Sequence, residues 1–249
     1  MIIIKTNTEI EYMRKAGKLT GETLLMLEEK VKPGVTTEDL DKLAEDYIRK
    51  HGGIPSFKGY GGFPASICTS INNEVIHGIP SKKRHLQEGD IISIDCGAIL
   101  NGWQGDAART FPVGKVSEEA QKLISVTKES FFKGAEKAVV GNRLTDISNA
   151  VQTYAESFGY SLVRDYVGHG IGKEMHEDPE VPNYGRPGRG PKLVNGMVIA
   201  VEPMVNVGKY QVVTQDNGWT VVTEDGSLAA HYENTIAILD GGSEILTLC

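Results

Sequence analysis

Two aspartates, Asp95 and Asp106, stand at the ends of the stretch DCGAILNGWQGD. The Asn-Gly pair at 101–102 is typical of a two-residue type I′ turn, and that register pairs Asp95 with Ala108. Asp106 is then two residues from the partner of Asp95, and side chains two apart on a strand share a face. Diagonal neighbours on paired strands lie within about 7 to 8 Å. The spacing therefore predicts that both carboxylates converge on one point above a hairpin.

Glu202 and Glu233, like Asp95, stand in largely apolar segments that read as strands. Burying an ionised carboxylate without a partner is costly, and clustering several like charges raises that cost. Arg109 is the one Lys or Arg directly beside these acids, and it can balance one charge at most. A pair of divalent metal ions would resolve the conflict.

His169 is a fifth candidate ligand because the glycines on both sides leave its imidazole unobstructed. Oxygen ligands with a single imidazole suit Mn(II), Fe(II), Co(II) or Zn(II) in a catalytic site, unlike a closed Cys-rich zinc site. His77 and His176 lie in segments rich in Gly or Pro that we expect to border a cleft. Composition alone leaves a surface-loop role open for both.

Capping residues and apolar periodicity predict four helices, at residues 6–31, 36–52, 117–139 and 144–159. Strands are expected in much of the remaining chain, so an α+β or mixed α/β domain is expected.

An internal repeat relates the two halves of the chain. A shift of 107 positions places GDIISID on GMVIAVE, and therefore Asp95 on Glu202. The same shift places Gly34 on Gly141. Two such halves would pack about a pseudo-twofold axis and bring their equivalent acids together. We expect one catalytic domain over residues 1–249, with halves at about 1–112 and 113–249.

Composition excludes several classes of protein. The chain has 249 residues, 40% of them hydrophobic, which is enough for a sizeable core. A net charge of −7 and a pI near 5.4 argue against binding to nucleic acid or to an anionic membrane. No apolar run approaches the roughly 18 residues of a membrane span, and the N-terminus lacks the core of a signal peptide. The three cysteines form no Cys-x-x-Cys pair, so we expect reduced thiols and a cytoplasmic location.

With these residues assembled, the chain resembles the type I methionine aminopeptidases of the M24 metallopeptidase family, from near residue 3 to its end. YVGHGIGKEMHEDPEVPNY is similar to the long His-containing signature of that family. The resemblance implies the pita-bread fold, in which two pseudo-symmetric α/β halves surround a central antiparallel sheet. It also implies two divalent metal ions (Co, Mn, Fe or Zn) and removal of the initiator methionine from nascent proteins with small second residues.

The family's five metal ligands fall, in order, on Asp95, Asp106, His169, Glu202 and Glu233. The resemblance implies that Asp106 and Glu233 bridge the two ions. Asp95 would complete one coordination sphere, and His169 with Glu202 the other. Glu202 also resembles the residue usually proposed to accept a proton from the attacking water.

Seven further positions are assigned to the substrate by the resemblance. His77 and His176 look like the catalytic residues that contact the substrate amide and its oxyanion. An apolar pocket for the thioether side chain is expected from residues matching Tyr60, Phe63, Cys68, Met175 and Trp219.

Two departures from the family pattern bear on substrate range. Asn183 stands where relatives often have His, and Gly61 where some have His, so the contacts at the site entrance stay open. The chain lacks the Cys-rich N-terminal extension and matches the short form. We expect a monomer that meets nascent N-termini, with at most transient ribosome contact.

Two other functions stay open. An X-Pro peptidase of the aminopeptidase P or prolidase kind shares the fold and the five ligands, but usually carries a substantial extra N-terminal domain. A non-enzymatic binding relative would be expected to have lost ligands, whereas all five are present here.

Overall fold

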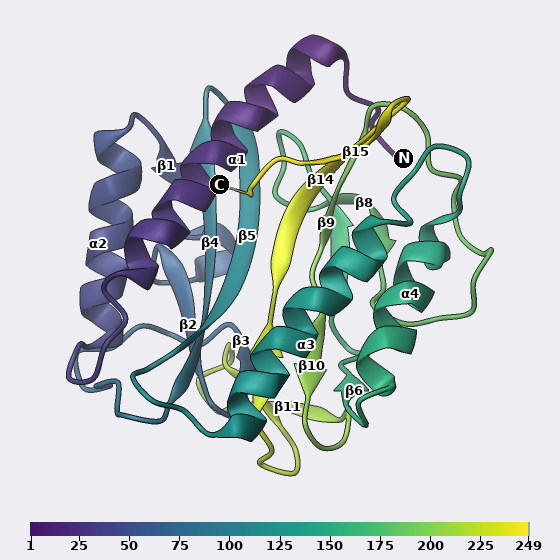
Figure 1. Cartoon of the computed structure of the whole chain (residues 1–249). Coiled ribbons are helices and arrows are strands. Elements are labelled where there is room, and N and C mark those ends of the chain that lie inside the picture. The colour runs from purple at the N-terminus through teal and green to yellow at the C-terminus, as the bar shows by residue number, and fades with distance from the viewer. Residues whose placement is uncertain (249) are drawn as a thin grey trace.

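The computed structural model describes residues 1–248 and confirms the expected α+β class (Figure 1). The helices are α1 (Asn7–Glu28), α2 (Thr37–Lys50), α3 (Glu118–Ala135) and α4 (Leu144–Glu156), with a 3-10 turn, η1, at Tyr60–Gly62. The strands of the N-terminal half are β1 (Ile54–Pro55), β2 (Ile67–Ile71), β3 (Glu74–Ile76), β4 (Ile91–Leu100) and β5 (Trp103–Pro112). Those that follow are β6 (Ser161–Leu162), β7 (Gly168–Gly170), β8 (Glu177–Val181), β9 (Met197–Val201), β10 (Met204–Asn206), β11 (Val212–Thr214), β12 (Val221–Thr223), β13 (Ala229–His231), β14 (Glu233–Leu239) and β15 (Gly242–Ile245).

Local capping explains where the helices begin. Thr6 and Glu9 form a capping box at α1, and Thr36 with Asp39 forms another at α2, as predicted. The hydroxyl of Ser117 accepts the Ala120 N–H at the start of α3. The predicted end of α3 at residue 139 is wrong. The helix stops at 135, because the chain there tightens into turns in which the N–H groups of Lys137 and Ala138 bond to carbonyls three residues back.

The central sheet runs in the order β1-β4-β5-β14-β9-β7-β8, with β2 paired to β4 and β15 to β14. Every pair within it is antiparallel. In Figure 1, α1 covers β4 and β5, α2 lies beside α1 at the left edge, and α3 and α4 cover the part of the sheet beyond β14. Buried side chains of α1 and α2 pack with neighbouring strands in one cluster, and those of α3 and α4 pack with their strands in two. No helix within residues 1–248 is long and apolar enough to cross a membrane.

Equivalent positions of the sequence repeat adopt equivalent backbone conformations. Gly89 and Gly196, which shortly precede β4 and β9, have positive φ angles of 95° and 86°. Gly34 and Gly141, which precede α2 and α4, have φ of 89° and 97°. The left-handed region suits glycine, so the repeated glycines mark the same turn in each half. The division of the chain near residue 112 stays a prediction.

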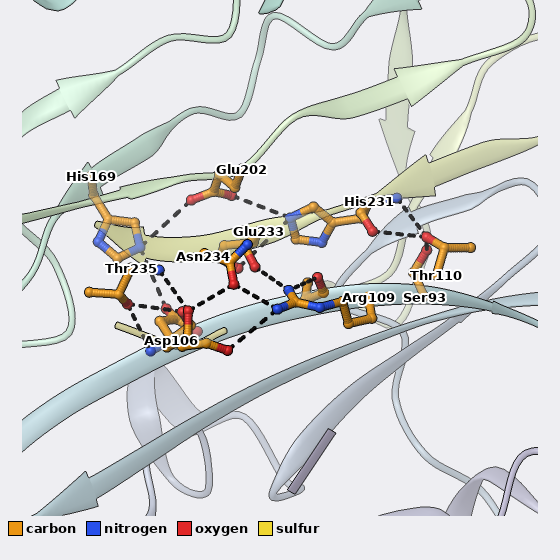
Figure 2. A network of polar contacts seen from close by, with 12 residues as sticks. Ser93, Asp106, Arg109, Thr110, His169, Glu202, His231, Glu233, Asn234 and Thr235 are labelled. Atoms are coloured by element: carbon orange, nitrogen blue, oxygen red, sulfur yellow. Dashed lines mark hydrogen bonds and ion pairs between the residues drawn. The ribbon is translucent and has the colours of Figure 1, made fainter. Parts of the chain in front are cut away.

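The two halves of the sheet meet at a short ladder between β5 and β14, in which Ala107 and Ala108 face Asn234 and Glu233. A threonine hydroxyl extends this junction at each end. Thr235 Oγ1 accepts the N–H of Asp106 at 3.1 Å and donates to its carbonyl at 2.9 Å (Figure 2). Thr110 Oγ1 makes the same pair of bonds to the backbone of His231, each 2.9 Å long.

Candidate active site

The hairpin predicted at Asn101-Gly102 is confirmed. Both turn residues have positive φ, of 53° and 80°, and Asp95 pairs with Ala108 across β4 and β5. Ala108 pairs on its other side with Glu233 of β14. Directly opposed residues share a face of a sheet, so Asp95 and Glu233 flank the small side chain of Ala108 on one face. Asp106, two residues along β5, lies on the same face.

These acids line a cavity of about 90 Å³ on that face. The cavity brings together all twelve side chains that the sequence predicted for the site, and Phe57 as well. Its lining residues are Phe57, Tyr60, Phe63, Cys68, His77, Asp95, Asp106, His169, Met175, His176, Glu202, Trp219 and Glu233.

Five of these side chains form a buried cluster of donor atoms. Ligand atoms of Asp106, His169 and Glu233 lie within 4.8 Å of one another. Nε2 of His169 is 3.6 Å from an oxygen of Asp106 and 3.7 Å from an oxygen of Glu202. One buried oxygen each of Asp95, Asp106 and Glu233 has no hydrogen-bond partner within the described residues. Unpartnered carboxylate oxygens beside an imidazole are a donor set that fits a divalent transition-metal ion.

The buried carboxylates of this cluster repel one another. Burial, reinforced by neighbouring carboxylates, raises the pKa of Asp95 and Glu233 well above the usual range. Burial also raises the pKa of Glu202 to about 8, although His169 partly offsets the effect. Burial acts to lower the pKa of His169, but Asp106 and Glu202 outweigh it and raise that pKa to about 9. A bound cation would relieve the repulsion between the acids.

This electrostatic conflict predicts a pH dependence of the metal-stripped protein. The folded pKa of Glu202 is raised to about 8 and that of His169 to about 9, so both contribute stability that is lost as pH rises through those values. Burial holds the pKa of His77 near 4 and that of His231 near 3, so both are neutral in the folded protein. Their unfolded forms are mostly neutral above pH ~7 as well, so the two histidines add only a small opposing slope there. We expect the Tm to fall between pH ~7 and ~8.5, by about 2 to 4 °C for each kcal/mol by which the free energy of unfolding decreases.

Thermal melts of chelator-treated protein across that pH range check this. The same melts with saturating Mn(II) should show little of the slope, because the cation keeps the acids ionised and His169 neutral. A stripped protein whose Tm stays level or rises over the range would contradict the charge arrangement.

The two predicted substrate histidines lie at the border of the cavity. His77 follows β3 with a φ of 59°, which is uncommon outside glycine and typical of a constrained functional position. Its ring makes an edge contact with Tyr166 at 5.9 Å between centroids. Nδ1 of His176 lies 2.7 Å from the hydroxyl of Tyr60, and its ring is 4.3 Å from that of His169. Burial, then the charge of His169, lowers the pKa of His176.

The remaining wall of the cavity is apolar. Phe63 and Trp219 make an edge-to-face contact with centroids 5.2 Å apart. Gly97 permits the approach of Phe57 and Met175, since a Cβ at this position would come within 2.8 Å and 3.1 Å of their side chains. Burial raises the pKa of the Cys68 thiol well above its usual range, so Cys68 contributes as a small neutral side chain.

The surroundings of Gly61 and Asn183, the two departures from the family pattern, are well defined in the structure. Gly61 has a φ of 56°, a conformation that disfavours a side chain, and a Cβ there would lie 3.6 Å from Trp219. Asn183 is buried and donates from Nδ2 to the backbone carbonyl of Glu202 at 2.9 Å. It does not line the cavity, so its effect is on the backbone that carries Glu202.

Two residues near the cluster were not predicted from the sequence. Phe57 lies in an irregular loop, where no periodicity points to a cavity. His231 is buried, and its Nε2 is 3.9 Å from an oxygen of Glu202 and 3.9 Å from one of Glu233. The alternation of His231 and Glu233 about Tyr232 is a signal that could have placed both on one face.

Arg109 points away from the cavity. Its guanidinium donates to the carbonyls of Ala108 and Glu233 and stacks on Tyr232, 4.3 Å from the ring centroid. It lines a larger cavity of about 440 Å³ between α1 and α3, which contains none of the twelve predicted site residues. The prediction that Arg109 could neutralise at most one acid is consistent with this position.

Comparison with known proteins gives matches along the whole chain. The model of metallopeptidase family M24 matches residues 11–240. A methionine aminopeptidase of Clostridium acetobutylicum is 80% identical over 249 residues, covering 100% of both chains. The crystal structure of methionine aminopeptidase from Rickettsia prowazekii matches with a TM-score of 0.98 and 48% identity, covering 100% of both chains. A prolidase from Pyrococcus horikoshii matches with a TM-score of 0.80 and 25% identity, covering 99% of this chain and 64% of that one.

Proposed function

The chain belongs to metallopeptidase family M24 and is an aminopeptidase, and we propose that it removes the initiator methionine from nascent proteins with two divalent metal ions. The observation that carries this proposal is the single cavity that combines a buried donor cluster with an apolar pocket. The pita-bread fold agrees with that of solved methionine aminopeptidases. We further propose a cytoplasmic monomer that acts on emerging N-termini.

Five residues would hold the two ions. Asp106 and Glu233 come from adjacent strands at the junction of the two halves, which suits bridging ligands. Asp95 would belong to one coordination sphere, and His169 with Glu202 to the other. When bound, the ions lower the pKa of a water molecule and stabilise negative charge on the substrate carbonyl.

The chain's own polar side chains would handle the substrate. Glu202 is positioned to take the proton of the attacking water, because it is buried beside His169 at the cavity floor. His77 and His176 border the cavity and would donate to the substrate amide and to the oxyanion that forms. The Tyr60 hydroxyl beside Nδ1 of His176 would hold that ring in place.

The apolar wall would select the first residue of the substrate. An unbranched thioether can enter between the aromatic rings and contact the sulfur atoms of the wall. A chain branched at Cγ would clash with the same rings. The cavity volume of about 90 Å³ suits a single side chain of this size, and we propose that the second residue of the substrate is small.

Peptide hydrolysis by metal-stripped protein tests the proposal. The stripped protein is loaded with Mn(II), Fe(II) or Co(II) in turn. Hydrolysis of three peptides is then measured, namely Met-Ala-Ser, Leu-Ala-Ser and Ala-Pro-Ser. We expect metal-dependent release of methionine, with the Leu peptide cleaved about 10 to 200 times more slowly. Equal rates for Met and Leu peptides would remove the pocket assignment. Cleavage of Ala-Pro-Ser would favour an X-Pro peptidase, and bound metal without hydrolysis of any peptide would favour a binding role.

A further inference from the structure

His231 is a buried imidazole that the proposed mechanism does not use. Its side chain is 1% exposed, and neither ring nitrogen has a hydrogen-bond partner within residues 1–248. A buried polar group without a partner is destabilising, so its presence calls for a function. Its backbone is held on both sides by the hydroxyl of Thr110, which fixes where the ring is placed.

The ring lies between two of the proposed metal ligands (Figure 2). Nε2 of His231 is 3.9 Å from Oε2 of Glu202 and 3.9 Å from Oε2 of Glu233. The other oxygen of Glu202, Oε1, is 3.7 Å from Nε2 of His169. The Glu202 carboxylate is therefore flanked by one imidazole on each side.

The contacts favour a positioning role over a metal-ligand role. Nε2 of His169 approaches Oδ2 of Asp106 and Oε1 of Glu202, whereas Nε2 of His231 approaches the Oε2 atoms of Glu202 and Glu233. The two imidazoles therefore contact opposite oxygens of the Glu202 carboxylate.

We propose that His231 is a positioning residue for Glu202 and Glu233, whose Oε2 atoms accept a hydrogen bond from its Nε2–H group. This inference rests on the proposed function. A small rotation of either carboxylate shortens the 3.9 Å separation to hydrogen-bond length. For Glu202 this contact leaves Oε1 on the side of His169, at 3.7 Å from its Nε2. Partners behind metal ligands commonly change metal affinity about 10- to 100-fold when they are removed.

Two variants of similar size separate the donor from simple packing. His231→Gln keeps an N–H near the position of Nε2, and His231→Leu fills the space without a donor. We expect His231→Leu to weaken Mn(II) binding by about 10- to 100-fold in calorimetry, and His231→Gln to retain most of the affinity. The visible spectrum of bound Co(II) should change in the Leu variant and not in the Gln variant. His51→Leu, which removes an exposed imidazole, controls for adventitious binding.

The outcomes are distinct. If the wild-type protein binds no metal, the proposed function fails. If the wild type and His231→Leu bind Mn(II) equally and give the same Co(II) spectrum, the positioning role alone is overturned. Should the Leu variant not fold, ¹⁵N-histidine NMR of the Zn(II)-loaded wild type decides. An Nε2–H tautomer supports the role, and an Nδ1–H tautomer overturns it.

Discussion

Replacing Asp106 with alanine is expected to abolish both metal uptake and peptide hydrolysis while leaving the fold intact. Asp106 is 4% exposed and belongs to the one compact donor group found among the described residues. Its loss removes a proposed bridging ligand, and with it several kcal/mol of transition-state stabilisation. That corresponds to a fall in kcat/KM on the order of a thousandfold or more. Steady-state hydrolysis of Met-Ala-Ser and metal analysis of the purified variant measure the two effects.

The metal-free form of the variant offers an internal control for folding. Asp106 adds to the burial that raises the pKa of Asp95, Glu202 and Glu233, but it also stabilises protonated His169, so its removal relieves one interaction and loses another. We therefore expect Asp106→Asn, which keeps the shape, to melt close to the temperature of stripped wild type. Asp41→Asn is the matched control, because Asp41 accepts two backbone N–H groups outside the cavity. That variant keeps an Oδ1 that can accept both N–H groups, so it should remain folded and keep metal binding. Retained turnover in Asp106→Ala would refute the bridging role.

Replacing His176 with alanine should lower kcat strongly while leaving the metal content unchanged. His176 is exposed at the border of the cavity, and its ring stacks near His169. Removal of one donor to a developing oxyanion typically lowers kcat by about 10²- to 10³-fold. The KM should change much less, because the contact strengthens only as negative charge develops on the carbonyl.

Tyr60→Phe separates orientation of His176 from its direct contact with substrate. The tyrosine hydroxyl lies 2.7 Å from Nδ1 of His176 and holds that edge of the ring. The Phe variant should retain the donor and lose only its alignment, so its decrease in kcat should be smaller than that of His176→Ala. Loss of metal from His176→Ala would instead make this residue a ligand.

Features set by neighbouring residues could be predicted well. The turn at Asn101-Gly102 determined the β4–β5 register, and that register placed Asp95 opposite Ala108. Threonine with an acid three residues later correctly marked the starts of α1 and α2. Apolar strands carrying unpaired acids identified the metal-ligand candidates, since burial of such groups without a cation is costly.

Features that depend on contacts between distant segments were decided by the tertiary structure. Thr235 holds the backbone of Asp106 from 129 residues away, and Thr110 holds that of His231 from 121 residues away. No local pattern specifies such contacts, which arise only when β5 and β14 meet. For the same reason Phe57 and His231 were missed, and the contact of buried Asn183 with the backbone of Glu202 was left open. The sequence by itself determined which donor atoms the chain carries, because strand alternation and turn geometry are local. Packing of the two halves decided which residues contact those donor atoms and hold their backbone, because burial and long-range hydrogen bonding are properties of the assembled fold.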